Sequence, residues 1–286
     1  MAYKFGAHLS ISGGYHKALE RIKDIGGSCL QIFSGSPRGW SFPKINPKDC
    51  QLFIEKKNNF QINPVYFHAS YLVNLVDNGR IGIMSKKSLI NELEVASQLG
   101  IVGSIIHLGS FKDNRPTLWD VSKDKRYSIL ITNILEILTN TPKGVYFIIE
   151  NAGNRKIGQT LEEISMIIKD INDERVRLCL DTCHLYSAGY SFRNNTELNL
   201  LLDKLEKLDL LDKLELWHVN DSRDHFNSGH DRHENIGEGT IGLAEFKTLL
   251  NHPKMKNYPF IIETPGFNNE GPDKKNLDIL KTLING

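Results

Sequence analysis

The segment that decides the fold runs from residue 145 to residue 184 and reads VYFIIENAGNRKIGQTLEEISMIIKDINDERVRLCLDTCH. It opens with a short apolar run, rich in β-branched and aromatic residues, that ends at Glu150. It closes with a second such run that ends at Asp181. Between the runs, a stripe with the spacing of a core-facing helix is formed by Ile164, Ile167, Ile168 and Ile171. The segment therefore predicts a strand, a returning helix and a second, parallel strand.

The same unit repeats along the whole chain. Successive apolar runs are mostly separated by roughly 30–45 residues, the size of a strand plus its returning helix. The eight runs begin near Tyr3, Ser28, Val65, Ser104, Val145, Val176, Leu214 and Pro259. Further helical stripes lie between them at Ile131, Ile134, Leu135 and Leu138, at Leu198, Leu201, Leu202 and Leu205, and at Leu243, Phe246, Leu249 and Leu250.

Signals for helix ends support this division. Thr160 followed by Glu163 predicts a capping box, and Asn46-Pro47 places a cap residue before a proline at the first helical position. Gly100 is expected to end a helix that begins near Ser85. We therefore expect each apolar run to be followed by a defined helix.

Eight βα units without a break in composition predict a single (β/α)₈ TIM barrel over residues 1–286. The alternative is a doubly wound open sheet. Its Gly-rich phosphate loop is missing, because Ser12-Gly13-Gly14-Tyr15 does not match G-x-G-x-x-G. Gly237-Glu238-Gly239 follows no strand pattern and is interpreted as a turn. The barrel is the preferred prediction.

Composition excludes several classes of protein. Of the 286 residues, 40% are hydrophobic and 24% charged, which is typical of a globular chain. No apolar run approaches a membrane span, and the N-terminus has no secretory pattern. Four cysteines predict a reducing, cytoplasmic location, with all four as buried small hydrophobes. A net charge of +1 restricts nucleic-acid contact to a local site or to bound cations.

Polar side chains recur where the predicted strands end. The residues at or just beyond these ends are His8, His68, His107, Glu150, Asp181, His184, His218 and Glu263. In a barrel of this kind, catalytic groups project from the C-terminal ends of the strands. Carboxylates gathered there without compensation would repel one another, so the set predicts bound cations. Imidazole and carboxylate ligands favour zinc, with manganese or iron as alternatives.

A shorter motif adds to this set. Asp231 and His233 are two residues apart, so on an extended segment both point the same way and can chelate one ion. Taken alone, the motif equally fits a solvated loop. Cys183 stands between Asp181 and His184 as a further candidate ligand. However, its spacing from Cys179 is not that of a C-x-x-C site.

The motifs, in this order, resemble the endonuclease IV family of apurinic/apyrimidinic-site DNA nucleases over nearly the whole chain. They are GAHLS at 6–10, FHASY at 67–71, IHLGS at 106–110, ENAG at 150–153, LDTCH at 180–184, HVNDS at 218–222, HDRH at 230–233, GEG at 237–239 and ETPG at 263–266. The resemblance implies a TIM barrel that holds three zinc ions, with Mn²⁺ as an alternative occupant of one site.

The resemblance also implies which residues bind these ions. The expected ligands are His68, His107 and Glu150 for the first zinc, Glu150 again with Asp181, His218 and Glu263 for the second, and His184, Asp231 and His233 for the third. Neutral imidazoles and ionised carboxylates would leave a cluster of three Zn²⁺ with a charge of about +2. The metals, rather than a coat of lysines, would then attract a DNA phosphate.

The activity implied is hydrolysis of the phosphodiester 5′ to an abasic site in double-stranded DNA, giving a 3′-hydroxyl and a 5′-deoxyribose phosphate, as in base excision repair. Removal of blocked 3′ ends is a further expected activity. We expect a hydroxide between the first two zincs to attack while the third stabilises the leaving 3′ oxygen. Glu263 and Glu150 are the expected catalytic carboxylates, and Glu263 would orient the hydroxide.

Lesion recognition is also expected from the resemblance. Arg38 and Tyr71 match rim-loop positions that penetrate the duplex, and Arg223 matches a phosphate contact where a lysine is common. Gly39 departs from the family pattern, which often has a glutamine there. An abasic nucleotide has no base to stack, so extruding it costs less than extruding a normal one. No obligate protein partner is expected, and a closed barrel without sheet edges favours a monomer.

Three other functions compete with this prediction. A metal-dependent sugar isomerase or epimerase uses a related barrel, but no lysine stands at a strand end here. An amidohydrolase would need His-x-His on its first strand, and His8-Leu9-Ser10 lacks it. A non-catalytic DNA-binding or zinc-holding protein would be favoured by a lost ligand, and none is lost.

Overall fold

Eight parallel strands form a closed barrel in the order β1-β10-β7-β6-β5-β4-β3-β2. The computed structural model describes residues 3–40, 42–111, 121–153 and 156–284. The barrel strands are β1 (Lys4–His8), β2 (Cys29–Phe33), β3 (Val65–His68), β4 (Gly103–Ile106), β5 (Tyr146–Glu150), β6 (Val176–Asp181), β7 (Leu214–His218) and β10 (Pro259–Ile262). The (β/α)₈ prediction is confirmed, with each strand beginning within a residue of its expected start.

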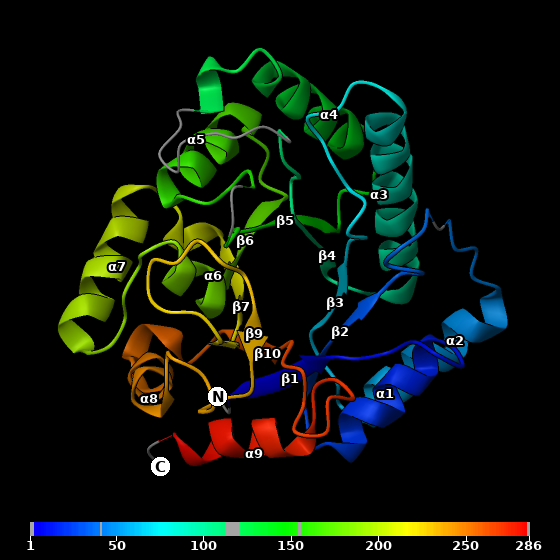
Figure 1. Cartoon of the computed structure of the whole chain (residues 1–286). Coiled ribbons are helices and arrows are strands. Elements are labelled where there is room, and N and C mark those ends of the chain that lie inside the picture. The colour runs from blue at the N-terminus through cyan, green and yellow to red at the C-terminus, as the bar shows by residue number, and fades with distance from the viewer. Residues whose placement is uncertain (1–2, 41, 112–120, 154–155, 285–286) are drawn as a thin grey trace.

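Helices surround the strands, as Figure 1 shows in a view into the barrel. They are α1 (Tyr15–Asp24), α2 (Pro47–Asn59), α3 (Arg80–Leu99), α4 (Tyr127–Thr139), α5 (Leu161–Ile171), α6 (Thr182–Ser187), α7 (Asn195–Lys207), α8 (Leu243–Asn251) and α9 (Lys274–Thr282). Short 3₁₀ turns are η1 (Val121–Lys123), η2 (Leu211–Lys213) and η3 (Pro253–Met255). The strands β8 (Asp221–Ser222) and β9 (His233–Glu234) pair antiparallel outside the barrel. Among the described residues, no helix combines the length and apolar character of a membrane span.

The local signals for helix ends operate as expected, with two exceptions. The Thr160 hydroxyl accepts a hydrogen bond from the Glu163 amide at 3.2 Å, and Gly100 ends α3 in the left-handed region. The Glu163 carboxylate accepts from the Gln159 amide at 3.2 Å rather than from that of Thr160, so the capping box is only half formed. However, α3 begins at Arg80 rather than near Ser85. The Asp77 carboxylate accepts from the Gly82 amide at 2.9 Å and so satisfies a free donor of the first turn. Ser85 is an interior helical residue.

Three further expectations about burial are wrong. Leu243, expected on the core-facing stripe of α8, is 44% exposed, because it is the first residue of the helix and only Phe246, Leu249 and Leu250 face the core. In α4 the buried apolar residues are Tyr127, Leu130, Ile134, Ile137 and Leu138, whereas Ile131 is half-buried and Leu135 is 40% exposed. The segment is apolar on nearly every side, so its periodicity does not identify the packed face. Cys50 is only half-buried, and its thiol donates to the Gln98 carbonyl at 3.2 Å; the other three cysteines are buried.

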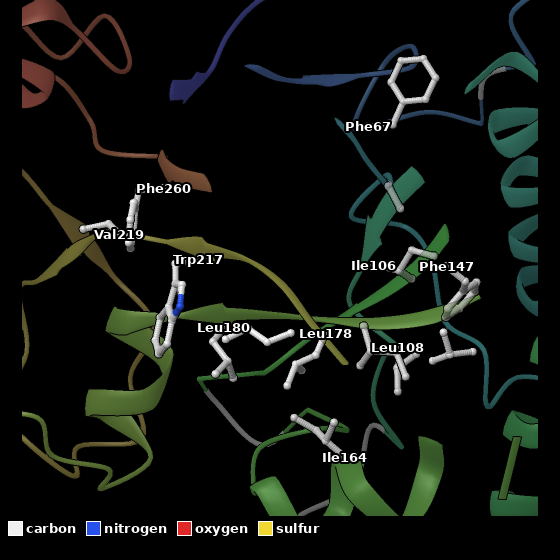
Figure 2. Close-up of a cluster of buried hydrophobic side chains, with 14 of the residues drawn as sticks. Phe67, Ile106, Leu108, Phe147, Ile164, Leu178, Leu180, Trp217, Val219 and Phe260 are labelled. Carbon is white, nitrogen blue, oxygen red and sulfur yellow. The ribbon is translucent and has the colours of Figure 1, made fainter. Parts of the chain in front are cut away.

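Strand alternation divides the apolar core into two layers. The larger lies between the outer wall of the barrel and the helices; Figure 2 shows part of it, with Ile164 of α5 below Leu178 and Leu180 of β6. The smaller layer fills the barrel interior with Cys29, Tyr66, Ile105, Ile148, Cys179, Leu216 and Ile261. These two layers hold the strands in one register and so fix what projects from their carboxyl ends.

One buried carboxylate comes from a helix rather than from a strand end. Glu92 of α3 is 3% exposed and accepts hydrogen bonds from the hydroxyls of Ser34 and Ser104. Burial raises the pKa of Glu92 to about 7, although both hydroxyls oppose this shift. Because the pKa in the folded state exceeds that of an unfolded glutamate, ionisation of Glu92 destabilises the fold.

We predict that Glu92→Gln makes the protein less sensitive to alkaline pH. The contribution of the protonated carboxyl is complete below about pH 4.5 and is lost as the pH rises through about 7, a loss of about 3 kcal/mol. Denaturant unfolding at pH 5 and pH 8 should therefore show the variant gaining stability relative to the wild type at the higher pH. Glu94→Gln, on the exposed face of the same helix, is the matched control. Parallel pH profiles for all three proteins would contradict the prediction.

Candidate metal centre

A layer of polar side chains lies directly above the apolar interior of the barrel. Each of the eight barrel strands contributes one residue, at the same phase of the strand alternation. The eight are His8, Gln31, His68, His107, Glu150, Asp181, His218 and Glu263. Seven of them stand two residues beyond a member of the interior apolar cluster. Chain direction and alternation therefore direct all eight into one small volume at the mouth of the barrel.

Glu150 lies at the centre of this layer and is fully buried. Its Oε2 is 3.1 Å from His68 Nε2 and 3.3 Å from His107 Nε2. Its Oε1 is 3.1 Å from His218 Nδ1. One carboxylate thus contacts histidines from three strands, and its two oxygens face two different groups of ligand atoms.

The second group joins Glu150 to the far side of the barrel. His218 Nδ1 is 3.4 Å from Glu263 Oε2 and 3.9 Å from Asp181 Oδ2. Ligand atoms of Glu150, Asp181, His218 and Glu263 all lie within 4.8 Å of one another. The same holds for His68, His107 and Glu150. The two groups share Glu150.

A third group forms around His184. Its Nε2 is 2.9 Å from Asp231 Oδ1 and 3.5 Å from His233 Nε2, and His233 Nε2 is 3.5 Å from the same Asp231 oxygen. Asp181 accepts from the His184 amide at 3.0 Å, which starts α6 and turns His184 toward the mouth. Asp181 and Cys183 each also lie within ligand distance of His233. All nine sequence-predicted ligands are therefore brought together.

Amide and carbonyl groups orient these side chains. His68 Nδ1 lies 2.9 Å from the Ala69 carbonyl, and His184 Nδ1 lies 2.8 Å from the Asn151 carbonyl. A protonated Nδ1 that donates to a carbonyl leaves Nε2 with a free lone pair. Asn220 donates to Asp181 Oδ2 at 2.6 Å and accepts from the Glu263 amide at 2.7 Å. Such partners are those that orient ligands in metal sites.

Charge in this layer is strongly coupled. Burial opposes ionisation of Glu150, but the neighbouring His107 and His218 hold its pKa well below the usual range. Burial likewise lowers the pKa of His184, but the carboxylates of Asp181 and Asp231 outweigh it and raise that pKa to about 10. The pKa of His107 falls to about 3, chiefly because of burial. Glu150 thus remains ionised at neutral pH and requires positive charge beside it.

This donor set fits divalent cations. Ring nitrogens and carboxylate oxygens converge at 2.9–3.9 Å, and several of the close pairs, including His184 with His233, repel unless a cation or a proton lies between them. Mixed imidazole and carboxylate ligands suit zinc, manganese or iron better than calcium or magnesium. The residues present therefore fit the ions that the sequence analysis expects.

The expected DNA-contacting residues are arranged unevenly around the mouth. Tyr71 is 67% exposed and borders the cavity of about 450 Å³ above His68, His107 and Glu263. Its amide donates to the Pro37 carbonyl at 3.2 Å, so the loop carrying Arg38 lies against it. Arg38 is exposed, as is Arg223, whose Nε pairs with Glu234 at 3.1 Å on the β8–β9 side.

Gly39 has no backbone requirement for glycine. Its φ is not in the left-handed region, and a Cβ built there would approach only Ser36, at 3.6 Å. A larger residue would therefore fit. The absence of a side chain at this position leaves space beside Arg38.

Sequence reasoning missed two residues at the mouth. Gln31 belongs to the polar layer, and the alternation of Cys29, Gln31 and Phe33 in the second apolar run was the available signal. Lys156 lines the cavity with its Nζ 3.8 Å from Asp231 Oδ2. Lys156 follows a loop rather than a strand, so no periodic signal pointed to it.

Comparison with known proteins agrees with this geometry. The family model of the xylose isomerase-like TIM barrels matches residues 19–283. A protein of Sulfurihydrogenibium sp. (strain YO3AOP1) named "Probable endonuclease 4" is 35% identical over 284 residues, 98% of each chain. One from Aquifex aeolicus (strain VF5) with the same name is 34% identical over 283 residues, 98% of this chain and 97% of the other. The chain belongs to the endonuclease IV family.

Solved structures support the same relationship. Endonuclease IV from Thermus thermophilus superposes with a TM-score of 0.82 at 30% identity, covering 98% of each chain. A D-tagatose 3-epimerase-like protein superposes with a TM-score of 0.67 at 22% identity, which shows a shared fold alone. The resemblance of the motifs to the endonuclease IV family is thus confirmed, and this family is one of nucleases.

We predict that removing divalent metal lowers the thermal stability of the protein. An ion present at about 100 times its dissociation constant stabilises the folded state by about 2.7 kcal/mol, which corresponds to about 4–5 °C for a domain of this size. Melting curves with added zinc and with a strong chelator measure the difference. Glu150→Gln should reduce this difference, because Glu150 contacts two ligand groups, whereas Glu94→Gln should not. Equal melting temperatures with and without chelator would contradict a metal centre.

Proposed function

We propose that this chain is a metal-dependent endonuclease that hydrolyses the phosphodiester 5′ to an abasic site in double-stranded DNA. The products are a 3′-hydroxyl and a 5′-deoxyribose phosphate, so the step belongs to base excision repair, and blocked 3′ ends are further substrates. In this proposal the chain acts inside the cell as a monomeric single barrel of residues 1–286. The observation that carries the proposal is the convergence of all nine expected ligands at the mouth of the barrel.

The grouping of the ligands supports three Zn²⁺, one of them replaceable by Mn²⁺. His68, His107 and Glu150 would hold the first. Glu150, Asp181, His218 and Glu263 would hold the second, and His184, Asp231 and His233 the third. When bound, such ions lower the pKa of water, neutralise phosphate oxygens and stabilise a leaving alkoxide. The side chains of the protein then have to bind the substrate, orient it and accept the proton of the attacking water.

The two expected catalytic carboxylates have different access to a substrate. The Glu150 side chain is fully buried, whereas that of Glu263 is 17% exposed and lines the cavity. Glu263 Oε1 accepts from Gln31 and lies 3.2 Å from His8 Nδ1, so its orientation is fixed. Glu263 is therefore the carboxylate that can orient an attacking water and accept its proton, and Glu150 holds the two ligand groups together.

The rim residues would select the lesion. Tyr71 lies beside the cavity, where its ring can stack on a DNA base. The guanidinium of the adjoining Arg38 can bind a phosphate. Lys156 adds a cation at the cavity wall, next to the third ligand group. Arg223 would contact the backbone farther along the duplex, exchanging its partner Glu234 for a phosphate.

We predict that Glu263→Gln lowers kcat for incision of a duplex with one abasic site by about 10²–10⁴-fold, the usual contribution of a general base. The assay measures nicking of a labelled duplex, and chelator-treated wild-type enzyme is the negative control. Glu94→Gln, on the exposed face of α3, should nick at the wild-type rate. Epimerisation of a ketose without any nicking would contradict the proposed function and favour the sugar-epimerase alternative.

We predict that Tyr71→Ala weakens binding to the abasic duplex by about tenfold or more, because one base–aromatic stack contributes about 1–3 kcal/mol. Affinity for an intact duplex should change less, so the preference of the protein for abasic over intact DNA should fall. Titrations of both duplexes at one salt concentration measure this. Leu200→Ala removes an equally exposed side chain from the outer helix α7 and is the control. An equal loss of affinity for both duplexes would show that Tyr71 does not read the lesion.

A further inference from the structure

Gln31 is the one member of the polar layer that is neither imidazole nor carboxylate. It lies on β2 and is fully buried. Its Oε1 is 2.6 Å from His218 Nε2, and its Nε2 is 2.5 Å from Glu263 Oε1 and 2.8 Å from His8 Nδ1. A single amide therefore contacts side chains from β1, β7 and the end of β10, across the interior of the barrel.

The orientation of this amide follows from its neighbours. The Gln31 atom that lies 2.5 Å from Glu263 Oε1 is Nε2, and an amide nitrogen donates where a carboxylate oxygen accepts. The NH₂ group of Gln31 must therefore face Glu263, and its carbonyl oxygen must face His218. A carbonyl oxygen accepts but cannot donate, so His218 carries a proton on Nε2. Its Nδ1 is the nitrogen 3.1 Å from Glu150 Oε1 and 3.4 Å from Glu263 Oε2, at the second ligand group.

We propose that Gln31 is the positioning residue of this centre: it holds His218 with Nδ1 directed at the second metal position and fixes the carboxylate of Glu263 beside it. The proposal rests on the metal centre of the proposed function. The Nε2 of Gln31 also lies 2.8 Å from His8 Nδ1, so the His8 ring packs against the amide and limits its movement. Gln31 thus connects the ligand that is buried, His218, to the carboxylate that faces the cavity, Glu263.

Packing alone does not account for a glutamine at this position. The preceding interior residue of β2 is Cys29, and a buried amide costs free energy unless each polar atom has a partner. Gln31 has His218 as the partner of its oxygen and Glu263 as the acceptor for its NH₂ group. Partners that orient metal ligands typically change metal affinity by about 10–100-fold when they are replaced. A merely structural amide would change folding stability instead.

The test compares Gln31→Met, which keeps the length of the side chain and removes both polar groups, with Ser104→Ala. Ser104 is a fully buried polar residue of β4 whose hydroxyl donates to Glu92, which is not one of the nine ligands. Zinc affinity is measured ion by ion in competition with a chromophoric chelator. Melting of the metal-free proteins measures folding. The ring N–H resonances of the zinc-loaded proteins, after ¹⁵N-histidine labelling, report the Nε2 proton of His218.

We expect Gln31→Met to bind one of its zinc ions about 10–100-fold more weakly and to lose the slowly exchanging His218 N–H, while Ser104→Ala keeps both. Wild-type affinity for every ion in Gln31→Met would overturn the proposal. The proposal would also be overturned if both variants lost zinc affinity in proportion to their loss of folding stability. Failure of the wild-type protein to bind zinc would instead refute the metal centre itself, so the two failures are distinguishable.

Discussion

The closed barrel imposes one constraint from which the site follows. Side chains alternate between the inside and the outside of the barrel along every strand, and apolar side chains fill the interior. The next inward-facing residues along the strands are therefore brought into contact with one another. In this chain those residues carry imidazoles, carboxylates and one amide. Such a layer is unstable without positive charge to balance Glu150, Asp181 and Glu263. The fold and the need for cations therefore have the same origin.

Much of this arrangement could be predicted from the sequence. Strand starts were found within one residue because runs such as Phe147-Ile148-Ile149 are short, β-rich and end abruptly in a charged residue. The same abrupt ends identified the candidate ligands. Asp231 and His233 had less support, because a tripeptide in a loop has no periodic context. Their approach to His184 depends on the β8–β9 pairing and on the turn after His233.

Other features had no reliable local signal. The packed face of α4 was misassigned because apolar residues cover most of its surface, so only the neighbouring helices decide what is buried. The early start of α3 depends on Asp77, a residue outside the helical pattern. Gln31 lies inside β2 rather than at its end, and a neutral amide in an apolar strand gives no signal for a metal site. Lys156 reaches the site from a loop, where direction cannot be read from spacing.

A D-tagatose 3-epimerase-like protein has the same barrel, so the function of this chain has to be argued from its site rather than from its fold. The most direct test of the account is anomalous diffraction at the zinc edge from crystals of the purified protein. Three peaks are expected at the mouth of the barrel: one within bonding distance of Glu150, one of His218 and one of His184. A well-ordered crystal grown with zinc that shows no peak among these side chains would contradict it.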